Sequence, residues 1–206
     1  MAQRLMFFID FDGTVTTRDV CEAMISQFAR PGWEEINRRW EEGTLSTLAC
    51  ARETFALMAM TREDLEALAA SQELSPGFPE FAAWAKAQGH PVYIVSDGYE
   101  DYISLILQKH GLDVPFYANR MREGPSGWDM EAPYYNELCG RCGACKSKII
   151  LDSMDEHSTR VYIGDGYSDR CPVYLADLVY AKGSLAAYCR RRGIPFRPFE
   201  NFWDII

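Results

Sequence analysis

The stretch "FFIDFDGTVT", residues 7–16, places two carboxylates directly after a short apolar run. Leu5 to Ile9 is apolar throughout, which predicts a buried strand, and Asp10 and Asp12 follow it. Like charges this close raise each other's pKa and cost stability unless a cation or a reaction uses them. A solvated turn is the plainer interpretation, because Asp and Gly are common in turns. Features elsewhere in the chain distinguish a site that uses both carboxylates from a solvated turn.

Composition narrows the class of protein. The chain has 206 residues, of which 48% are hydrophobic and 25% charged, as in a globular protein with one core and at most a small second domain. Its net charge of −9 argues against binding to nucleic acid, which needs clustered Lys and Arg. No run approaches the roughly 18 apolar residues of a membrane span, so we expect no membrane partner. Seven cysteines without a recognisable signal peptide predict reduced thiols and a cytoplasmic location.

The hydrophobic pattern changes once along the chain. From about residue 19 to residue 72 apolar residues recur at helical spacing. After Pro76-Gly77, short apolar runs alternate with helical segments, which is typical of a parallel sheet with crossover helices. The elements expected in this second part are strands at 91–96, 160–165 and 178–181, a β-hairpin over 114–133, and a helix from about Asp169.

This pattern predicts an α/β fold with a Rossmann-like parallel sheet and helices on both faces. A small all-helical cap is expected as an insertion after the first strand. The predicted core domain comprises residues 1–15 and 75–206, and the predicted cap comprises residues 16–74.

Polar residues follow three of the predicted strands. They are Asp10 and Asp12, then Ser96-Asp97-Gly98, then Gly164-Asp165-Gly166. Because the carboxyl ends of parallel strands meet at one edge of a sheet, we expect these groups to lie together. Several carboxylates beside open water positions suit Mg²⁺. With Lys146 at the start of a helix, the set is typical of phosphoryl transfer through an aspartyl-phosphate.

Four motifs in this order resemble the haloacid dehalogenase (HAD) superfamily of phosphatases. They are "IDFDGT" at 9–14, Ser96 in "IVSDG", Lys146 in "CKSKII" and "GDGYSD" at 164–169. The resemblance implies a HAD core and a Mg²⁺-dependent phosphatase that hydrolyses a small phosphorylated metabolite. The alternatives are a phosphotransferase or mutase on the same scaffold and a non-catalytic module that binds a phosphorylated ligand. A monomer or a homodimer is equally compatible with the sequence.

The resemblance also implies roles for individual residues. Asp10 would attack phosphorus, Asp12 would protonate the leaving oxygen and then activate water, and Lys146 would neutralise charge. The implied Mg²⁺ ligands are Asp10, the main-chain carbonyl of Asp12 and Asp165, with Asp169 binding directly or through water. The implied substrate-binding residues are Thr14, Asp19, Ser96, Asp97 and Gly98.

The helical insert resembles the cap of the phosphoserine phosphatase-like subfamily. Asp19 lies where these enzymes usually place a Glu that contacts the substrate ammonium. It could equally cap the helix that begins at Val20, and the sequence favours neither interpretation.

The segment "CGRCGACK" at 139–146 narrows the resemblance to two groups. One comprises the methionine-salvage phosphatases acting on 2-hydroxy-3-keto-5-methylthiopentenyl-1-phosphate, and the other comprises the phosphoethanolamine/phosphocholine phosphatases. Cys139, Cys142 and Cys145 have metal-ligand spacing and could hold a structural Zn²⁺, with reduced structural thiols as the alternative.

Overall fold

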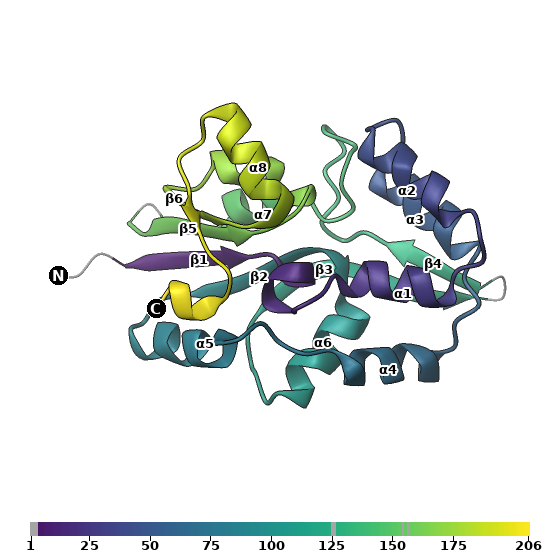
Figure 1. Cartoon of the computed structure of the whole chain (residues 1–206), viewed down its shortest axis with the longest axis horizontal. Helices are drawn as coiled ribbons and strands as arrows, with labels where there is room; N and C mark the ends of the chain where they lie inside the picture. The colour runs from purple at the N-terminus through teal and green to yellow at the C-terminus, as the bar shows by residue number, and fades with distance from the viewer. Residues whose placement is uncertain (1–3, 125–126, 154, 156) are drawn as a thin grey trace.

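The computed structural model describes residues 4–124, 127–153, 155 and 157–206 (Figure 1). Over these residues a seven-stranded sheet has the order β4-β3-β2-β1-β5-β6-β7. All neighbouring strands are parallel except β3 and β4, which form an antiparallel hairpin. The strands are β1 (Leu5–Ile9), β2 (Val92–Tyr99), β3 (Phe116–Gly124), β4 (Gly127–Glu131), β5 (Thr159–Gly164), β6 (Leu178–Ala181) and β7 (Arg197–Pro198).

Helices cover both faces of this sheet. Figure 1 shows α7 and α8 on one face and α5 and α6 on the other, with α4 beside α6. The predicted α/β fold with a mostly parallel, Rossmann-like sheet is therefore confirmed. The helices are α1 (Val20–Phe28), α2 (Trp33–Glu41), α3 (Thr47–Phe55), α4 (Arg62–Ser71), α5 (Phe78–Ala87), α6 (Glu100–Lys109), α7 (Lys146–Ser153) and α8 (Gly183–Arg192).

Strand β1 is apolar throughout because both of its faces are covered. Phe7 and Ile9 belong to the hydrophobic cluster under α5 and α6, whereas Met6 and Phe8 belong to the cluster under α7 and α8. Successive side chains of a strand point to opposite faces, so a central strand in such a sheet needs apolar residues at every position. The run ends at Asp10, where the chain leaves the sheet at its carboxyl edge.

The insert after β1 consists of the helices α1 to α4. Side-chain caps begin three of them, at Asp19, Ser46 and Thr61, as such residues commonly do. Figure 1 shows α2 and α3 beyond the carboxyl end of β1. Helix α4 instead packs on α6, where Arg62 Nη1 lies 3.0 Å from Asp101 Oδ1. The last helix of the insert therefore shares the core of the sheet domain, and the predicted boundary at residue 74 stays a prediction.

One expected element is wrong. The segment from Asp169 forms two short 3₁₀ turns, Ser168–Arg170 and Pro172–Tyr174, instead of a helix. The Asp169 carboxylate accepts hydrogen bonds from the N–H groups of Asp165 and Gly166, which bends the chain back on itself. Pro172 also lacks the N–H that a continuing helix would need.

The expected hairpin over 114–133 is confirmed. Arg120 pairs with Glu131 and Gly124 with Gly127, whereas Pro125 and Ser126 of the predicted turn lie outside the described residues.

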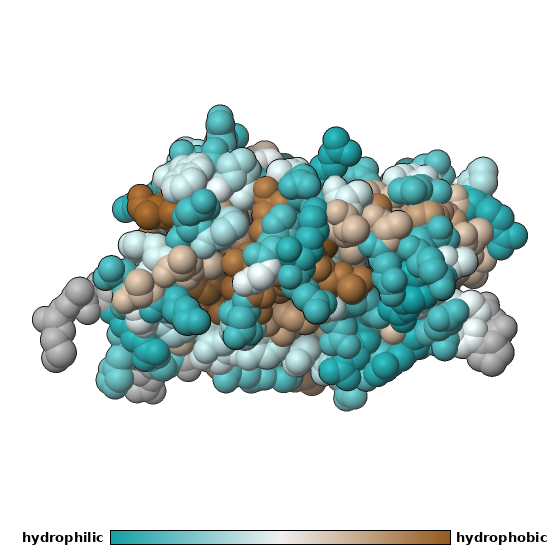
Figure 2. Space-filling model, turned by 90° about the horizontal axis from the view of Figure 1, so that it is seen from below, coloured by the Kyte–Doolittle hydropathy of each residue, from teal (hydrophilic) through white to brown (hydrophobic). Residues whose placement is uncertain are grey.

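The outer surface is mainly polar on the side of α4, α5 and α6. Figure 2 shows hydrophilic residues over most of this face, with hydrophobic patches near its middle. No helix in the described part of the chain is long and apolar enough to cross a membrane.

Candidate active site

A buried ammonium joins two carboxylates at the carboxyl edge of the sheet. Lys146 Nζ donates to Asp10 Oδ1 at 2.5 Å and to Asp169 Oδ1 at 2.6 Å. Their exposed fractions are 2% for Lys146, 5% for Asp10 and 0% for Asp169. Burial alone would lower the pKa of Lys146, but the two carboxylates outweigh it and raise that pKa. Burial also raises the pKa of Asp10, against the effect of the ammonium.

Asp169 has both carboxylate oxygens occupied by donors of the protein. Besides Lys146, the hydroxyl of Tyr162 donates to Oδ1 at 2.5 Å. The main-chain N–H groups of Asp165 and Gly166 donate to Oδ2 at 3.0 and 2.9 Å. This carboxylate therefore positions Lys146 and the loop after β5.

Asp12 lies in a different environment from Asp10. Its Oδ2 accepts from the hydroxyl of Tyr102 at 2.8 Å and from Ser96 Oγ at 3.3 Å. Its Oδ1 accepts from the N–H of Val20, in the first turn of α1, at 3.1 Å. Burial is the main reason that its pKa rises to about 7, which places its titration near neutral pH. The missing side chain of Gly98 matters here, because a Cβ there would clash with Tyr102 Oη and Asp12 Oδ2.

Three carboxylates lie close enough to share a cation. Ligand oxygens of Asp10, Asp165 and Asp169 all lie within 4.8 Å of one another. Thr14 was predicted to bind the substrate phosphate. In the structure its Oγ1 donates to Asp165 Oδ1 at 2.6 Å and so positions that carboxylate. The donor set, carboxylates close beside one another, suits Mg²⁺. The side chain of Asp12 is outside this group, and the expected use of its main-chain carbonyl stays a prediction.

Asp97 connects the sheet to the insert. Its Oδ1 accepts from the N–H of Ala144 at 2.8 Å and from Asn119 Nδ2 at 3.1 Å. Its Oδ2 accepts from Thr47 Oγ1, the first residue of α3, at 3.2 Å, and Thr47 in turn accepts from Trp40 Nε1 at 3.0 Å. We call this series Trp40–Thr47–Asp97 the cap link. It joins α2 and α3 to the residue directly after Ser96.

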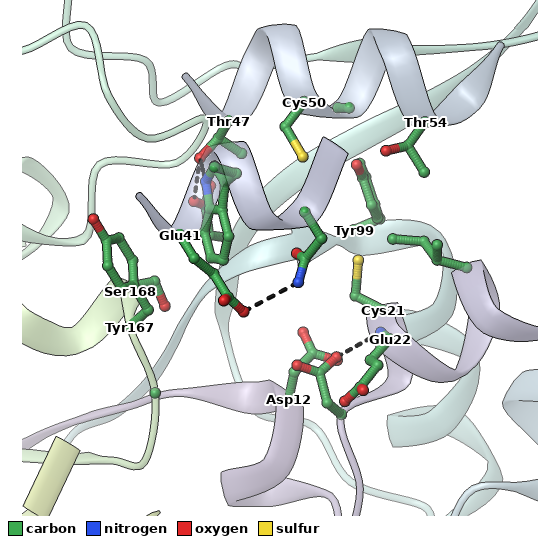
Figure 3. A pocket seen from close by; sticks show the side chains of 18 of the residues that line it. Asp12, Cys21, Glu22, Glu41, Thr47, Cys50, Thr54, Tyr99, Tyr167 and Ser168 are labelled. Carbon is green, nitrogen blue, oxygen red and sulfur yellow. Dashed lines mark hydrogen bonds between the residues drawn. The ribbon is translucent and has the colours of Figure 1, made fainter. Parts of the chain in front are cut away.

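A cavity of about 440 Å³ lies between the insert and the strand ends. Several predicted site residues line it, namely Asp10, Asp12, Asp19, Asp97, Gly98 and Asp165. Figure 3 shows Asp12 on one side of it and Thr47, Cys50 and Thr54 of α3 on the other. Asp19 accepts from the N–H of Glu22 at 2.7 Å, so it caps α1 as one of the two interpretations expected. It also lines the cavity, and its contact with a substrate stays a prediction. The side chains of Thr14, Ser96, Lys146 and Asp169 lie behind this lining.

The structure gives no support to zinc at Cys139, Cys142 and Cys145. Among the described residues, Asp10, Asp165 and Asp169 form the only group of three or more His, Cys, Asp or Glu ligands close enough for a metal. The segment that carries these cysteines, residues 139–145, contacts the insert instead. Arg141 O accepts from the N–H of Thr47 at 2.8 Å.

The sequence did not predict the part that two tyrosines play in the site, nor most of the residues through which the insert lines the cavity. Tyr102 and Tyr162 are completely buried, and each donates to a site carboxylate. A buried Tyr hydroxyl usually has a partner, but the sequence offers no signal for which partner. Trp33 and Trp40 of α2 also line the cavity.

The family model for haloacid dehalogenase-like hydrolases matches residues 7–171, which is most of the chain and includes all four motifs. The chain belongs to this family. Relatives named as phosphatases support the same class of enzyme. The predicted HAD-type phosphatase is therefore confirmed.

Two curated HAD relatives are named 2-hydroxy-3-keto-5-methylthiopentenyl-1-phosphate phosphatase. The protein of Geobacillus kaustophilus (strain HTA426) is 31% identical over 212 residues, covering 100% of this chain and 96% of the relative. The protein of Exiguobacterium sibiricum is also 31% identical, covering 96% of this chain and 92% of the relative. A solved phosphoserine phosphatase, described as a phospho-aspartyl intermediate analogue, superimposes with a TM-score of 0.72 at 19% identity and 99% coverage of both chains. At that identity the superposition shows the fold alone.

Proposed function

We propose that this HAD phosphatase is Mg²⁺-dependent and hydrolyses a small phosphomonoester through an aspartyl-phosphate on Asp10. One observation carries the proposal, namely that Asp10 and Asp12 line one cavity in different environments. Asp10 is paired with Lys146, whereas Asp12 accepts from Tyr102 and has a pKa of about 7. Two carboxylates with different surroundings can divide the roles of nucleophile and acid.

The proposed reaction has two steps. A carboxylate oxygen of Asp10 attacks phosphorus, the bond from phosphorus to the alcohol oxygen breaks, and Asp12 donates its proton to that oxygen. Asp12 then takes a proton from a water molecule that attacks the aspartyl-phosphate, which releases phosphate and restores Asp10. Ser96 Oγ lies 3.3 Å from Asp12, a long hydrogen bond that a phosphoryl oxygen can replace.

The carboxylates of Asp10 and Asp165 would bind Mg²⁺, together with the main-chain carbonyl of Asp12. When bound, Mg²⁺ neutralises phosphoryl oxygens and so reduces their repulsion of the attacking carboxylate. Asp169, whose oxygens are occupied, would hold Lys146 beside Asp10 throughout.

The candidate substrates fall into two groups. The named relatives favour 2-hydroxy-3-keto-5-methylthiopentenyl-1-phosphate, and phosphoethanolamine or phosphocholine is the alternative from the cysteine segment. The cytoplasmic location and the monomer or homodimer stay predictions.

The test is phosphate release from these substrates and phosphoserine with Mg²⁺, comparing wild type with Asp10→Asn. Asp152→Asn is the matched control, because Asp152 pairs with Lys148 on the surface, away from the cavity. We expect release by wild type and Asp152→Asn, loss with a chelator, recovery with added Mg²⁺ and no release by Asp10→Asn. Undiminished turnover by Asp10→Asn would rule out the aspartyl-phosphate, and transfer of phosphate to alcohols in preference to water would favour a phosphotransferase.

A further inference from the structure

Three guanidinium groups surround one tyrosine ring beside α8, the helix that lies next to α7 in Figure 1. The guanidinium carbons of Arg170, Arg191 and Arg192 lie 5.3, 5.9 and 5.7 Å from the centre of the Tyr188 ring. We call these three arginines the arginine cluster. Arg191 and Arg192 end α8, whereas Arg170 belongs to the 3₁₀ turn after β5, against which α8 packs. The cluster therefore joins two elements of the fold.

No carboxylate of the described residues forms an ion pair with the arginine cluster. Asp169, directly before Arg170 in the chain, is already paired with Lys146. Like charges gathered around one ring repel each other, and cation–π attraction to that ring offsets the repulsion only weakly. The cluster therefore has excess positive charge, on a chain whose net charge is −9.

The helix dipole explains only two of the three arginines. Cations near the C-terminus of a helix interact favourably with its dipole, which accounts for Arg191 and Arg192. Arg170 is not on α8, and its Nε is buried without a hydrogen-bond partner among the described residues. A buried N–H without an acceptor costs stability, so we expect an oxygen from outside the chain at this atom. Water could supply one oxygen, but only an anion would also balance three positive charges.

Two tyrosine hydroxyls add a donor to the arginine cluster. Tyr174 Oη and Tyr188 Oη lie 3.0 Å apart, so one of them donates to the other. The second O–H of this pair has no acceptor among the described residues. The hydrogen bond raises the pKa of Tyr174, and the nearby charge of Arg192 opposes that rise. One free hydroxyl donor and three guanidiniums therefore lie around the Tyr188 ring.

We propose that the arginine cluster, with the hydroxyls of Tyr174 and Tyr188, binds a small phosphate-type oxyanion outside the catalytic cavity. The planar fork of Arg matches paired oxygens of such an anion, and a diphosphate has enough oxygens and charge for three guanidiniums. None of these five residues lines the cavity. Arg170 also stacks on Tyr167, 4.0 Å from the ring centre, and Tyr167 does line it, so the site lies directly behind the cavity lining. Binding there does not require the proposed hydrolysis.

The first experiment measures the binding of pyrophosphate by titration calorimetry, with the full chain dialysed free of divalent cations. Without Mg²⁺ the cavity disfavours anions, because no Arg, Lys or His is among the described residues that line it. We expect saturable binding of one pyrophosphate per chain, at least about ten-fold tighter than acetate or chloride at equal ionic strength. The same response to all three anions would mean screening of surface charge only and would overturn the proposal.

The second experiment removes two charges from the arginine cluster with the double substitution Arg191→Gln and Arg192→Gln. Two of three guanidiniums are lost, so the Kd for pyrophosphate should rise at least about ten-fold. The matched control, Arg190→Gln with Arg197→Gln, removes the same charge from exposed arginines that lie over other rings, and should change Kd by less than about two-fold. Equal losses in both proteins would indicate an effect of net charge, and unchanged affinity in the cluster variant would place pyrophosphate elsewhere. Either result would overturn the proposal.

A third measurement follows Arg170 in the unsubstituted protein, because its neighbour Asp169 positions Lys146. In isotope-labelled protein the NMR resonance of the Arg170 Nε–H group should shift as pyrophosphate is added, since this buried N–H gains an acceptor. The resonance is assigned with Arg170→Lys, which lacks Nε. No shift at saturating pyrophosphate would overturn the proposal. None of these measurements needs turnover, so failure of the proposed phosphatase function would be recognised separately.

Discussion

At the scale of single residues, Lys146 shows how environment separates similar side chains. Lys148 lies two positions further along α7, with its side chain 48% exposed and paired with Asp152. One helical step is ~100°, so two lysines two positions apart face different directions. Helical geometry predicts that at most one of the pair enters the site, and the structure places Lys146, the lysine predicted from the sequence, between Asp10 and Asp169.

Lys146→Met tests this assignment. Removing the ammonium leaves two buried carboxylates without their partner, which costs about 3–5 kcal/mol of unfolding free energy. Loss of the charge beside the phosphate should also lower kcat by roughly 10²- to 10³-fold. Denaturant unfolding and phosphate release measure the two effects. Lys148→Met is the matched control, and a comparable loss in that variant would contradict the assignment.

Gly98→Ala tests the close contact around Asp12. A Cβ at this position would clash with Tyr102 Oη and Asp12 Oδ2, so one of them must move. We expect kcat to fall by at least about 10-fold as the proton donor is displaced, with about 1–3 kcal/mol of overpacking. Gly124→Ala, in the hairpin, should leave kinetics unchanged, because a Cβ there would make only an ordinary van der Waals contact with Gly127 O. Wild-type kinetics in Gly98→Ala would mean that the position of Asp12 is unimportant.

At the scale of elements, the cap link holds α2 and α3 over the strand ends. Asp97 accepts from Thr47 in α3, Asn119 in β3 and Ala144 in the cysteine segment, so one half-buried carboxylate connects three segments far apart in the sequence. The sequence predicted Asp97 as a substrate contact because it follows Ser96. The structure shows that its oxygens already accept hydrogen bonds from the protein, one of them from Thr47 at the start of α3.

Thr47→Val tests the cap link. The substitution keeps the shape of the side chain but leaves Trp40 Nε1 without its acceptor and Asp97 Oδ2 without its donor, at about 1 kcal/mol. We expect KM to rise more than kcat falls, because α2 and α3 line the cavity but take no part in bond breaking. Thr44→Val is the control, since Thr44 Oγ1 donates only to Arg39 O among the described residues. Unchanged KM in Thr47→Val would show that the link does not position the insert.

At the scale of the whole molecule, the insert and the sheet domain share one hydrophobic cluster. Val20, Phe55 and Leu65 of the insert belong to the same cluster as Phe7 and Ile103 of the sheet domain. Elements that share a core commonly unfold together, so we expect the insert and the sheet domain to unfold in one transition.

Calorimetry tests whether the insert and the sheet domain unfold together. We expect one unfolding transition, with calorimetric and van't Hoff enthalpies that agree. Leu65→Ala, at a completely buried position on α4, should lower the stability of the whole chain by about 2–5 kcal/mol while the transition remains single. A separate early transition in either protein would show that the insert unfolds independently.

The sequence by itself determined the fold class, the hairpin and the order of the four motifs, because these depend on local periodicity and on residues adjacent to strands. It also identified Asp10, Asp12, Asp165 and Lys146 as neighbours, since the ends of parallel strands meet at one edge. Only the tertiary structure decided which donors hold these groups. Tyr102 and Tyr162 come from positions whose apolar pattern hides their hydroxyls. The cavity arises where α1 and α3 face the end of β2, a long-range packing arrangement that local sequence patterns do not encode.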